Sequence, residues 1–378
     1  MGLLADELGR RTRLPRVTLL VLFGLIAGPA VLDLLPREFQ SWYDFLATIS
    51  LTMVAFLLGG RLSIAVLKRN GRSILSVSFW VVLSTAAIVG SGLLLAGVAL
   101  PLALVLAGMA TATDPAAIQD VARQNNADGP VTATLLGVVA VDDAWGLIAF
   151  ALLLAIARAG AGDGSADVLL HGLWEVGGAI ALGGILGVPA AYLTGRLRSG
   201  EPTQMEALGL VLLCAGIAVW LQVSFLLSGM IAGAIIANLA QHHSRPFHEI
   251  EQIEWPFMVL FFVLAGTTLQ FDSVRNIGLI VVAYIVLRIG SRVAGSCIGG
   301  VSAGLASGRS AEIGIALLPQ AGVALGMALV ASTHFPELRE QLMAVAIATT
   351  LFFELVGPLL TQKVLMRAGE IGQGADLE

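Results

Sequence analysis

Two adjacent aspartates in the middle of an apolar run are the residues of this sequence best suited to chemistry. Asp142 and Asp143 lie within the apolar stretch from about 135 to 156. Such a run is long enough to cross a bilayer, because about 20 helical residues cover ~30 Å of hydrocarbon. A charge at the centre of a membrane helix costs ~2.5–3.5 kcal/mol even on mild insertion scales. Carboxylates kept at that depth usually mark ion paths or proton relays, so the pair is a candidate ion site.

Two further apolar runs are interrupted by proline. In the first run, Thr113 precedes Asp114 and Pro115. Asp at the cap and Pro in the first turn form a helix start signal, which here falls in mid-membrane. In the second run, Pro319 and Gln320 interrupt an apolar sequence. Backbone groups freed at this depth are tolerated only where protein or a wet cavity satisfies them. Each run therefore predicts two half-helices joined by an extended stretch.

These two breaks indicate a transporter with a site at the bilayer midplane. Interrupted helices of opposite direction in the two halves of a chain are typical of inverted-repeat transporters. Half-helix ends carry partial charges of about ±0.5, which need compensation. Asp114 suits the positive N-termini, and Arg288, the deepest basic residue, suits the negative C-termini. Arg292 lies one turn further along and is the alternative counter-charge.

The elements that must position these residues are membrane helices. The chain has 378 residues, of which 57% are hydrophobic and 12% charged. A soluble domain carries about twice that charged fraction. The net charge of −5 argues against a nucleic-acid partner, and the two cysteines lie in apolar runs that suggest neither a disulfide framework nor a metal site. We therefore expect a polytopic membrane protein in contact with the lipid bilayer, not an enzyme, and without a cofactor.

The hydropathy pattern predicts an all-α protein of about 12 transmembrane helices with inverted repeats. The expected spans are 17–35, 43–60, 73–97, 99–119, 131–157, 169–195, 206–222, 224–240, 253–270, 275–298, 310–332 and 341–362. The seventh and eighth spans form one apolar stretch that is interrupted only near Gln222–Ser224.

Loop charges support this count and set the orientation. If the N-terminus is cytoplasmic, only four of the 21 basic residues fall in outside loops. These four are Arg37, Arg158, Arg275 and Arg339. A bias of this size follows the positive-inside rule, and a missed span would scramble it. We therefore expect both termini in the cytoplasm. The expected location is the plasma membrane of the cell, in particular a bacterial inner membrane.

The order of several short motifs resembles the monovalent cation/proton antiporter superfamily, in particular bacterial sodium/proton antiporters. The motifs are Thr113–Pro115, Asp142–Asp143, a basic residue in the tenth span, Pro15–Pro29, Leu227–Gly233, Phe261–Gly266 and Glu354–Pro358. The resemblance covers nearly the whole chain. It implies a core bundle at about 73–157 and 275–362, and a dimerisation part at about 17–60 and 206–270. The helix at 169–195 would link the two parts, and the protein would be a homodimer.

The resemblance also implies roles for the site residues. Asp143 would bind the transported cation, Na⁺ or Li⁺, while Asp142 would pair with the basic residue of the tenth span. Arg288 is the expected partner because it lies deeper, and Arg292 is the alternative. Thr113 would line the site. The sequence departs from the family's electroneutral branch, which has Asn at the position of Asp142 and Glu at that of Val138. It departs from the electrogenic branch in having Arg where Lys is usual. Because Arg effectively never loses its proton, any second proton would ride on Asp142.

A mechanism of competition follows from these residues. Carboxylate, carbonyl and water oxygens suit hard cations such as Na⁺ or Li⁺. Asp143 can hold a cation or a proton but not both, so antiport results if either load lets the core move and the bare anion does not. The alternatives are a K⁺/H⁺ antiporter of the same fold, a Na⁺-coupled solute symporter with a related fold, and a passive cation channel. A purely structural ion pair is the remaining interpretation.

Overall fold

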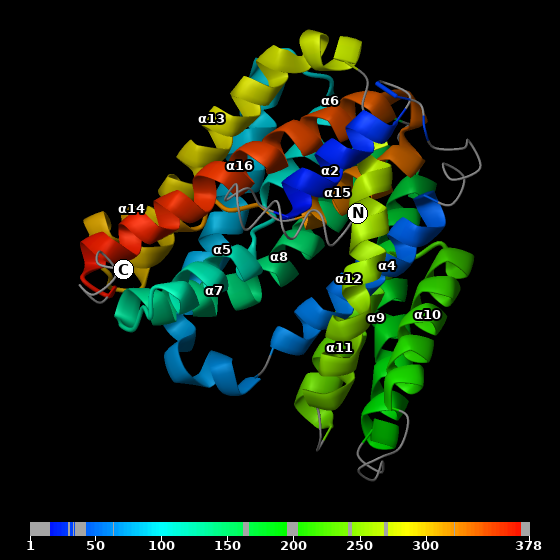
Figure 1. Ribbon diagram of the computed structural model, residues 1–378, viewed down its shortest axis with the longest axis horizontal. Helices are drawn as coiled ribbons and strands as arrows, with labels where there is room; N and C mark the ends of the chain where they lie inside the picture. Colours follow the sequence, from blue (N-terminus) through cyan, green and yellow to red (C-terminus); the bar gives the residue numbers. More distant parts are fainter. Residues whose placement is uncertain are drawn as a thin grey trace. The chain divides into compact units, whose positions relative to one another are not determined.

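The computed structural model of the chain describes most of its length. The described residues are 16–28, 31–32, 34, 43–62, 64–161, 166–194, 203–240, 244–267, 271–320 and 322–371. Every regular element within these ranges is a helix (Figure 1). The expected all-α fold class is therefore confirmed.

The helices group into two compact units. Unit 1 comprises Met1–Ile64 and Arg158–Phe271, and unit 2 comprises Ala65–Ala157 and Asp272–Glu378. The helices of unit 1 are α2 (Arg16–Ala27), α4 (Tyr43–Arg61), α9 (Ala166–Thr194), α10 (Thr203–Leu221), α11 (Phe225–Leu239) and α12 (Ser244–Thr267). Those of unit 2 are α5 (Ile64–Leu95), α6 (Leu100–Ala110), α7 (Pro115–Gln124), α8 (Pro130–Ala161), α13 (Phe271–Ser302), α14 (Ser307–Ala316), α15 (Val323–His334), a 3-10 turn (Pro336–Leu338) and α16 (Arg339–Ala368).

Unit 1 is built on the close packing of α4 against α11. Both helices carry glycine at the contact. A Cβ at Gly59 would lie 2.0 Å from the carbonyl oxygen of Met230, and one at Gly233 would lie 2.1 Å from that of Phe56. Small residues of this kind let membrane helices approach backbone to backbone, where dispersion replaces the missing hydrophobic driving force. The same α11 also packs against α9, and the two run side by side with α10 in Figure 1.

Unit 2 contains both interrupted helices. The first run divides into α6 and α7 between Ala110 and Pro115, and the second into α14 and α15 between Ala316 and Val323. The breaks meet, because the backbone N–H of Asp114 donates to the carbonyl of Pro319 over 3.0 Å. Each break thus satisfies part of the backbone that the other exposes, as mid-membrane unwinding requires.

Eight helical segments in the described ranges are long and apolar enough to span a membrane. Three shorter apolar helices accompany them, at Phe45–Gly60, Phe225–Leu239 and Val323–His334. Each expected span overlaps a helix or a broken pair of helices, although α2 ends at Ala27 and residues 29–30, 33 and 35 of the first span lie outside the described ranges. The count of twelve crossings stays a prediction, as does the cytoplasmic position of the termini, since 1–15 and 372–378 are also outside these ranges.

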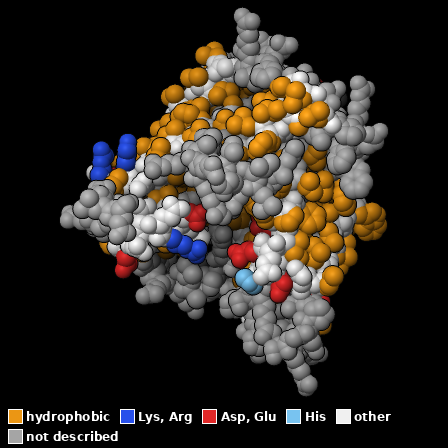
Figure 2. Space-filling model, viewed as in Figure 1, with side chains coloured by type: hydrophobic (Ala, Val, Ile, Leu, Met, Phe, Trp, Pro, Cys, Tyr) orange, Lys and Arg blue, Asp and Glu red, His pale blue; other side chains and the backbone are white. Residues whose placement is uncertain are grey.

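The described surface suits a lipid environment. Many large apolar side chains are exposed, including Tyr192, Trp220 and Leu279. Figure 2 shows one face on which apolar side chains cover most of the described area, while charged side chains gather at its left edge and in its lower half. In water such a surface would drive association, whereas lipid tails solvate it.

Candidate functional site

A buried ion pair forms the centre of the candidate site in unit 2. Arg292 of α13 places Nη1 2.8 Å from Oδ2 of Asp142 on α8, and both side chains are fully buried. A buried pair needs further hydrogen bonds to offset its desolvation. Arg292 obtains them from the break of the first interrupted helix, since Nη2 lies 3.2, 2.6 and 3.1 Å from the carbonyl oxygens of Ala110, Thr111 and Ala112.

The two aspartates share a hydroxyl contact from that same break. Oγ1 of Thr113 lies 2.7 Å from Oδ2 of Asp142 and 3.4 Å from Oδ1 of Asp143. A hydroxyl has one proton to donate, so the shorter contact to Asp142 takes it in this structure. The structure thus brings together three predicted site residues, Asp142, Asp143 and Thr113. Asp143 is only 4% exposed.

Arg288 does not pair with Asp142, although its depth in the membrane made it the expected partner. Its Nε donates to Ala110 O over 3.0 Å, and Nη1 and Nη2 donate to Leu318 O and Ala112 O, both over 2.7 Å. Arg292, the alternative, makes the ion pair instead. The partner is decided by which turn of α13 faces Asp142, and the two arginines are one turn, ~6 Å, apart along the axis.

Arg288 instead lies where negative helix ends converge. Its acceptors are carbonyls just past the end of α14 and at the end of α6 and in the break that follows it. Unsatisfied C-terminal carbonyls carry the negative end of a helix dipole, so a guanidinium there is electrostatically favoured. The ring of Phe353 on α16 covers the other side, 4.2 Å from Arg288 Cζ. This position suits the dipole compensation proposed for Arg288 from the sequence.

Asp114 serves the opposite helix end. Its Oδ1 accepts from the backbone N–H of Ala117 over 3.0 Å, which makes it the N-cap of α7. Pro115 follows in the first turn, where a missing N–H costs nothing. The helix start that the sequence predicts at Asp114 and Pro115 is therefore present in the structure.

The second break has a different side-chain environment. Gln320 is fully buried, and its Nε2 lies 3.3 Å from the hydroxyl of Tyr284, one turn before Arg288 on α13. Its Oε1 accepts no hydrogen bond from the described residues. The carbonyl of Pro319 accepts a hydrogen bond from the backbone N–H of Asp114. Pro319 also packs closely on α16, where a Cβ at Gly357 would lie 2.7 Å from Pro319 Cα. The hydrogen-bond partners found for Gln320 and Pro319 at this break are Tyr284 and Asp114.

Ser78 joins the site although the sequence did not single it out. Its Oγ lies 3.5 Å from Asp142 Oδ1, and the side chain is fully buried on α5. Ser78 is one of several serines in its apolar run, with Ser73, Ser76 and Ser84, so the sequence carries no signal that links it to an aspartate 64 positions later. Only the packing of α5 against α8 reveals it, through a shared cluster of apolar side chains that includes Val77 and Val138.

The atoms of this site that could bind a cation are all oxygens. Carboxylate, hydroxyl and backbone carbonyl groups are the ligands that hard monovalent cations prefer. No three His, Cys, Asp or Glu side chains in the described part of the chain converge as in a transition-metal site. The arrangement thus offers one carboxylate held by an arginine, and a second beside it, in a buried setting where a proton or a small cation neutralises charge at large benefit.

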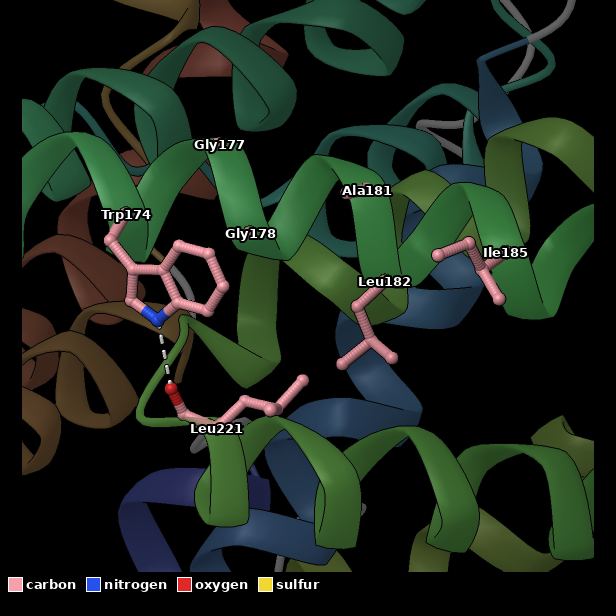
Figure 3. A pocket seen from close by; sticks show the side chains of 7 residues that line it. All are labelled: Trp174, Gly177, Gly178, Ala181, Leu182, Ile185 and Leu221. Atoms are coloured by element: carbon pink, nitrogen blue, oxygen red, sulfur yellow. Dashed lines mark hydrogen bonds between the residues drawn. The ribbon is translucent and has the colours of Figure 1, made fainter.

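A hollow in unit 1 has another character. It lies between α9 and α10, has a volume of about 500 Å³, and is lined mainly by apolar groups (Figure 3). The indole N–H of Trp174 bridges it to the carbonyl of Leu221 over 3.0 Å. Its lining residues are Trp174, Gly177, Gly178, Ala181, Leu182, Ile185 and Leu221. Since none of these side chains is charged, the hollow has no chemistry for ion exchange.

Comparisons with known proteins match this chain to membrane transporters. A family model described as "Sodium/hydrogen exchanger, transmembrane" matches residues 1–367. The chain is 26% identical over 334 residues to the Na(+)/H(+)-K(+) antiporter GerN of Bacillus cereus, which covers 85% of this chain and 83% of GerN. It is 25% identical over 141 residues to the Na(+)/H(+) antiporter NhaP of Pseudomonas aeruginosa, covering 37% of this chain and 33% of NhaP.

A solved structure shows the same fold. The sodium proton antiporter MjNhaP1 of Methanocaldococcus jannaschii, determined at pH 8, superimposes with a TM-score of 0.74 at 19% identity. The match covers 97% of this chain and 92% of that one. A second structure of MjNhaP1, by electron microscopy, gives a TM-score of 0.72 at 18% identity. The antiporter fold that the motifs predicted is therefore confirmed.

Proposed function

This chain belongs to the sodium/hydrogen exchanger family, and from that premise we propose that it exchanges Na⁺ or Li⁺ for H⁺ across a membrane by alternating access. The family is one of secondary transporters, so the protein is a transporter and not an enzyme. The observation that carries the proposal is the division of labour in the aspartate pair. Asp142 is held by Arg292, while Thr113 reaches toward both Asp142 and Asp143.

Asp143 is the exchangeable site in this proposal. Arg292 offsets the charge of Asp142 whenever that carboxylate is ionised, because a guanidinium keeps its proton. Asp143 then binds either Na⁺ or a proton, with Thr113 Oγ1 turning between the two carboxylates as the load changes. A carboxylate that carries neither load would pay the desolvation cost of an uncompensated charge. That cost blocks the movement of the empty anion and couples the two ions.

The number of protons depends on Asp142. If Asp142 keeps its ion pair throughout, one proton moves per Na⁺ and the exchange is electroneutral. If Asp142 also takes up a proton, Arg292 retains its three carbonyl contacts and two protons move. Voltage therefore distinguishes the schemes. A valinomycin-set potential that changes the wild-type rate, but not that of Asp142→Asn, supports the two-proton scheme. Equal responses of the two proteins contradict it.

The two units suit different roles in alternating access. Unit 2 contains both broken helices and the aspartate pair, so we propose that it is the moving core. Unit 1 would be the stationary part that forms a homodimer, with α9 as the link between the parts. Relatives from Bacillus and Pseudomonas support a bacterial plasma membrane as the location. Cross-linking between copies and sizing in detergent test the dimer.

K⁺/H⁺ exchange is the second candidate function. It is supported by the similarity to GerN, a relative whose name includes K⁺. Both cations would use the same oxygen ligands, and selectivity would depend on how closely Thr113 and the carbonyls of the break can approach the ion. The two functions share Asp143 and differ in the cation that dissipates a pH gradient.

Exchange in proteoliposomes tests these proposals. With an imposed pH gradient, we expect Na⁺ and Li⁺ to dissipate it through the wild-type protein, and K⁺ to do so only if the second function holds. Asp143→Asn removes the exchangeable charge and is expected to reduce the rate to that of protein-free vesicles. Asp120→Asn on the exposed face of α7 is a matched control that should retain wild-type exchange. Robust exchange by Asp143→Asn would rule out its role.

A further inference from the structure

The helix that bears the aspartate pair begins without a side-chain cap of its own. α8 starts at Pro130, and the residue before it is Gly129, which has no side chain to accept a hydrogen bond. Pro130 has no N–H, and the N–H of Ala133 already donates to Gly129 O over 2.9 Å. The first turn is thus left with two backbone donors, those of Val131 and Thr132.

Both donors are satisfied by one residue near the end of the sequence. Glu370 Oε1 accepts from Val131 N over 2.8 Å, and Oε2 accepts from Thr132 N over 2.7 Å. Oε2 also accepts from Thr132 Oγ1 over 2.8 Å, and the Glu370 carbonyl accepts from Asp128 N over 3.1 Å. A negative carboxylate at this position also faces the positive end of the α8 dipole.

Two glycines make this approach possible. A Cβ on Gly129 would lie 2.3 Å from the Glu370 carboxylate carbon, so only glycine leaves room for it. At the other end, Gly369 terminates α16 in the left-handed conformation, with φ of 72°. The N–H of Glu370 then turns back to Leu365 O over 3.2 Å, as in a Schellman cap, and the side chain reaches α8.

The helix that ends just before Glu370, α16, also contacts the region where the two helix breaks meet. Phe353 of α16 lies on Arg288, and Thr361 Oγ1 donates to Ala316 O at the end of α14 over 2.9 Å. Gln362 Nε2 donates to Oδ1 of Asn125, the C-cap of α7, over 3.1 Å. α16 therefore connects the two breaks with the start of α8, and Glu370, two residues past its end, makes the contact with α8.

We propose that Glu370 is a positioning residue for ion exchange. By capping the N-terminus of α8, it fixes where Asp142 and Asp143 lie along the axis of α8 relative to the two helix breaks. Asp143 lies 12 residues beyond Val131, or ~18 Å along a helix. A frayed or tilted first turn would move the carboxylates relative to Thr113 and Arg292, which belong to other elements. This inference rests on the proposed function for its transport readout only.

The experiment compares Glu370→Gln, Glu370→Ala and Thr132→Val with the control Glu337→Gln, an exposed acid just before α16. Hydrogen exchange in peptides covering 129–136 is expected to be about fivefold faster in Glu370→Ala, the equivalent of a lost cap. The half-saturating Na⁺ concentration should rise by about fivefold, the low end of coupling between distant sites. Glu370→Gln, which keeps one acceptor, and Thr132→Val should lie between wild type and Glu370→Ala.

The outcomes separate this inference from the proposed function. Faster amide exchange at 129–136 with an unchanged half-saturating Na⁺ concentration means a structural cap only, and overturns the positioning role. Unchanged amide exchange overturns the cap itself. If Glu370→Ala does not fold, the milder Glu370→Gln and Thr132→Val decide between these results. Absence of Na⁺ exchange in the wild type would count against the proposed function and leave the amide result intact.

Discussion

The two interrupted helices of unit 2 have similar backbones and different chemistry. At the first break, the Asp114 side chain caps α7, and Arg292 contacts the carbonyls of Ala110–Ala112. At the second, Gly322 precedes α15 without a side-chain cap, and the buried polar group is the neutral Gln320, on Tyr284. Asp114, Asp142 and Arg292 thus gather at the first break, whereas Arg288 contacts carbonyls at both breaks.

The helices that follow the breaks repeat this contrast. α8 carries the buried pair Asp142 and Asp143, whereas α16 carries the buried pair Thr349 and Thr350. Thr349 Oγ1 donates to Val345 O of its own helix over 2.8 Å, so the proton of this hydroxyl is used within α16. The comparison teaches that the fold supplies two breaks of similar backbone, and that their side chains give them different chemistry.

The largest expected effect tests this contrast directly. Asp143→Asn should abolish Na⁺/H⁺ exchange, because the exchangeable charge is lost. Thr350→Val, a change of similar size at the corresponding place on α16, should leave most of the exchange rate intact, since no charge is involved. Initial rates of pH-gradient dissipation in proteoliposomes measure both. A transport-dead Thr350→Val that folds would show that both helices carry ions.

A second prediction separates the two arginines. Arg292→Ala leaves Asp142 buried without its ion pair, which should lower the free energy of unfolding by about 3–5 kcal/mol. Adding Asp142→Asn should restore part of this loss, since the uncompensated charge is gone. Arg288→Ala should also lower stability, but without rescue by Asp142→Asn, because Arg288 contacts carbonyls. Thermal unfolding in detergent measures the four variants. Equal rescue of both arginine variants would contradict the structural assignment.

A third prediction concerns the cap at the first break. Asp114→Ala removes the acceptor for Ala117 N–H and should cost about 1 kcal/mol, as helix caps typically do. Asp114→Asn keeps a side-chain oxygen at the same place and should cost less, the difference being the interaction of charge with the helix dipole. The thermal unfolding midpoints of the two variants check this order. Equal midpoints would mean that capping adds nothing at this depth.

The smallest effect is expected at Gln320 in the second break. Gln320→Leu loses one contact with Tyr284 but also removes a buried carbonyl oxygen that has no hydrogen bond in the described structure. These terms oppose each other, so the stability should change by no more than about 1 kcal/mol. Exchange should continue at a rate near that of the wild type. A loss of exchange comparable to that of Asp143→Asn would give the second break a direct role.

Much of the fold was predictable because it depends on local patterns. Proline removes a backbone donor and favours a helix break, and both breaks contain one, Pro115 and Pro319. Pro189, Pro256 and Pro358, by contrast, lie inside the continuous helices α9, α12 and α16. The order of short motifs predicted the antiporter fold, which the superposition on MjNhaP1 confirms. The Asp142–Asp143 dipeptide identified the candidate site, because two adjacent carboxylates are costly in an apolar helix and usually belong to an ion path or a proton relay.

The sequence by itself therefore determined the membrane class, the breaks and the carboxylate pair. Only the tertiary structure decided the partners. Arg288 and Arg292 lie one turn apart on the same helix, so their sequence context was nearly the same, and the rotation and height of α13 selected Arg292. Glu370 is 239 positions from Val131, and nothing local relates them. Such contacts depend on how helices pack, because backbone groups left over at one helix end are satisfied by whichever side chain the fold places there.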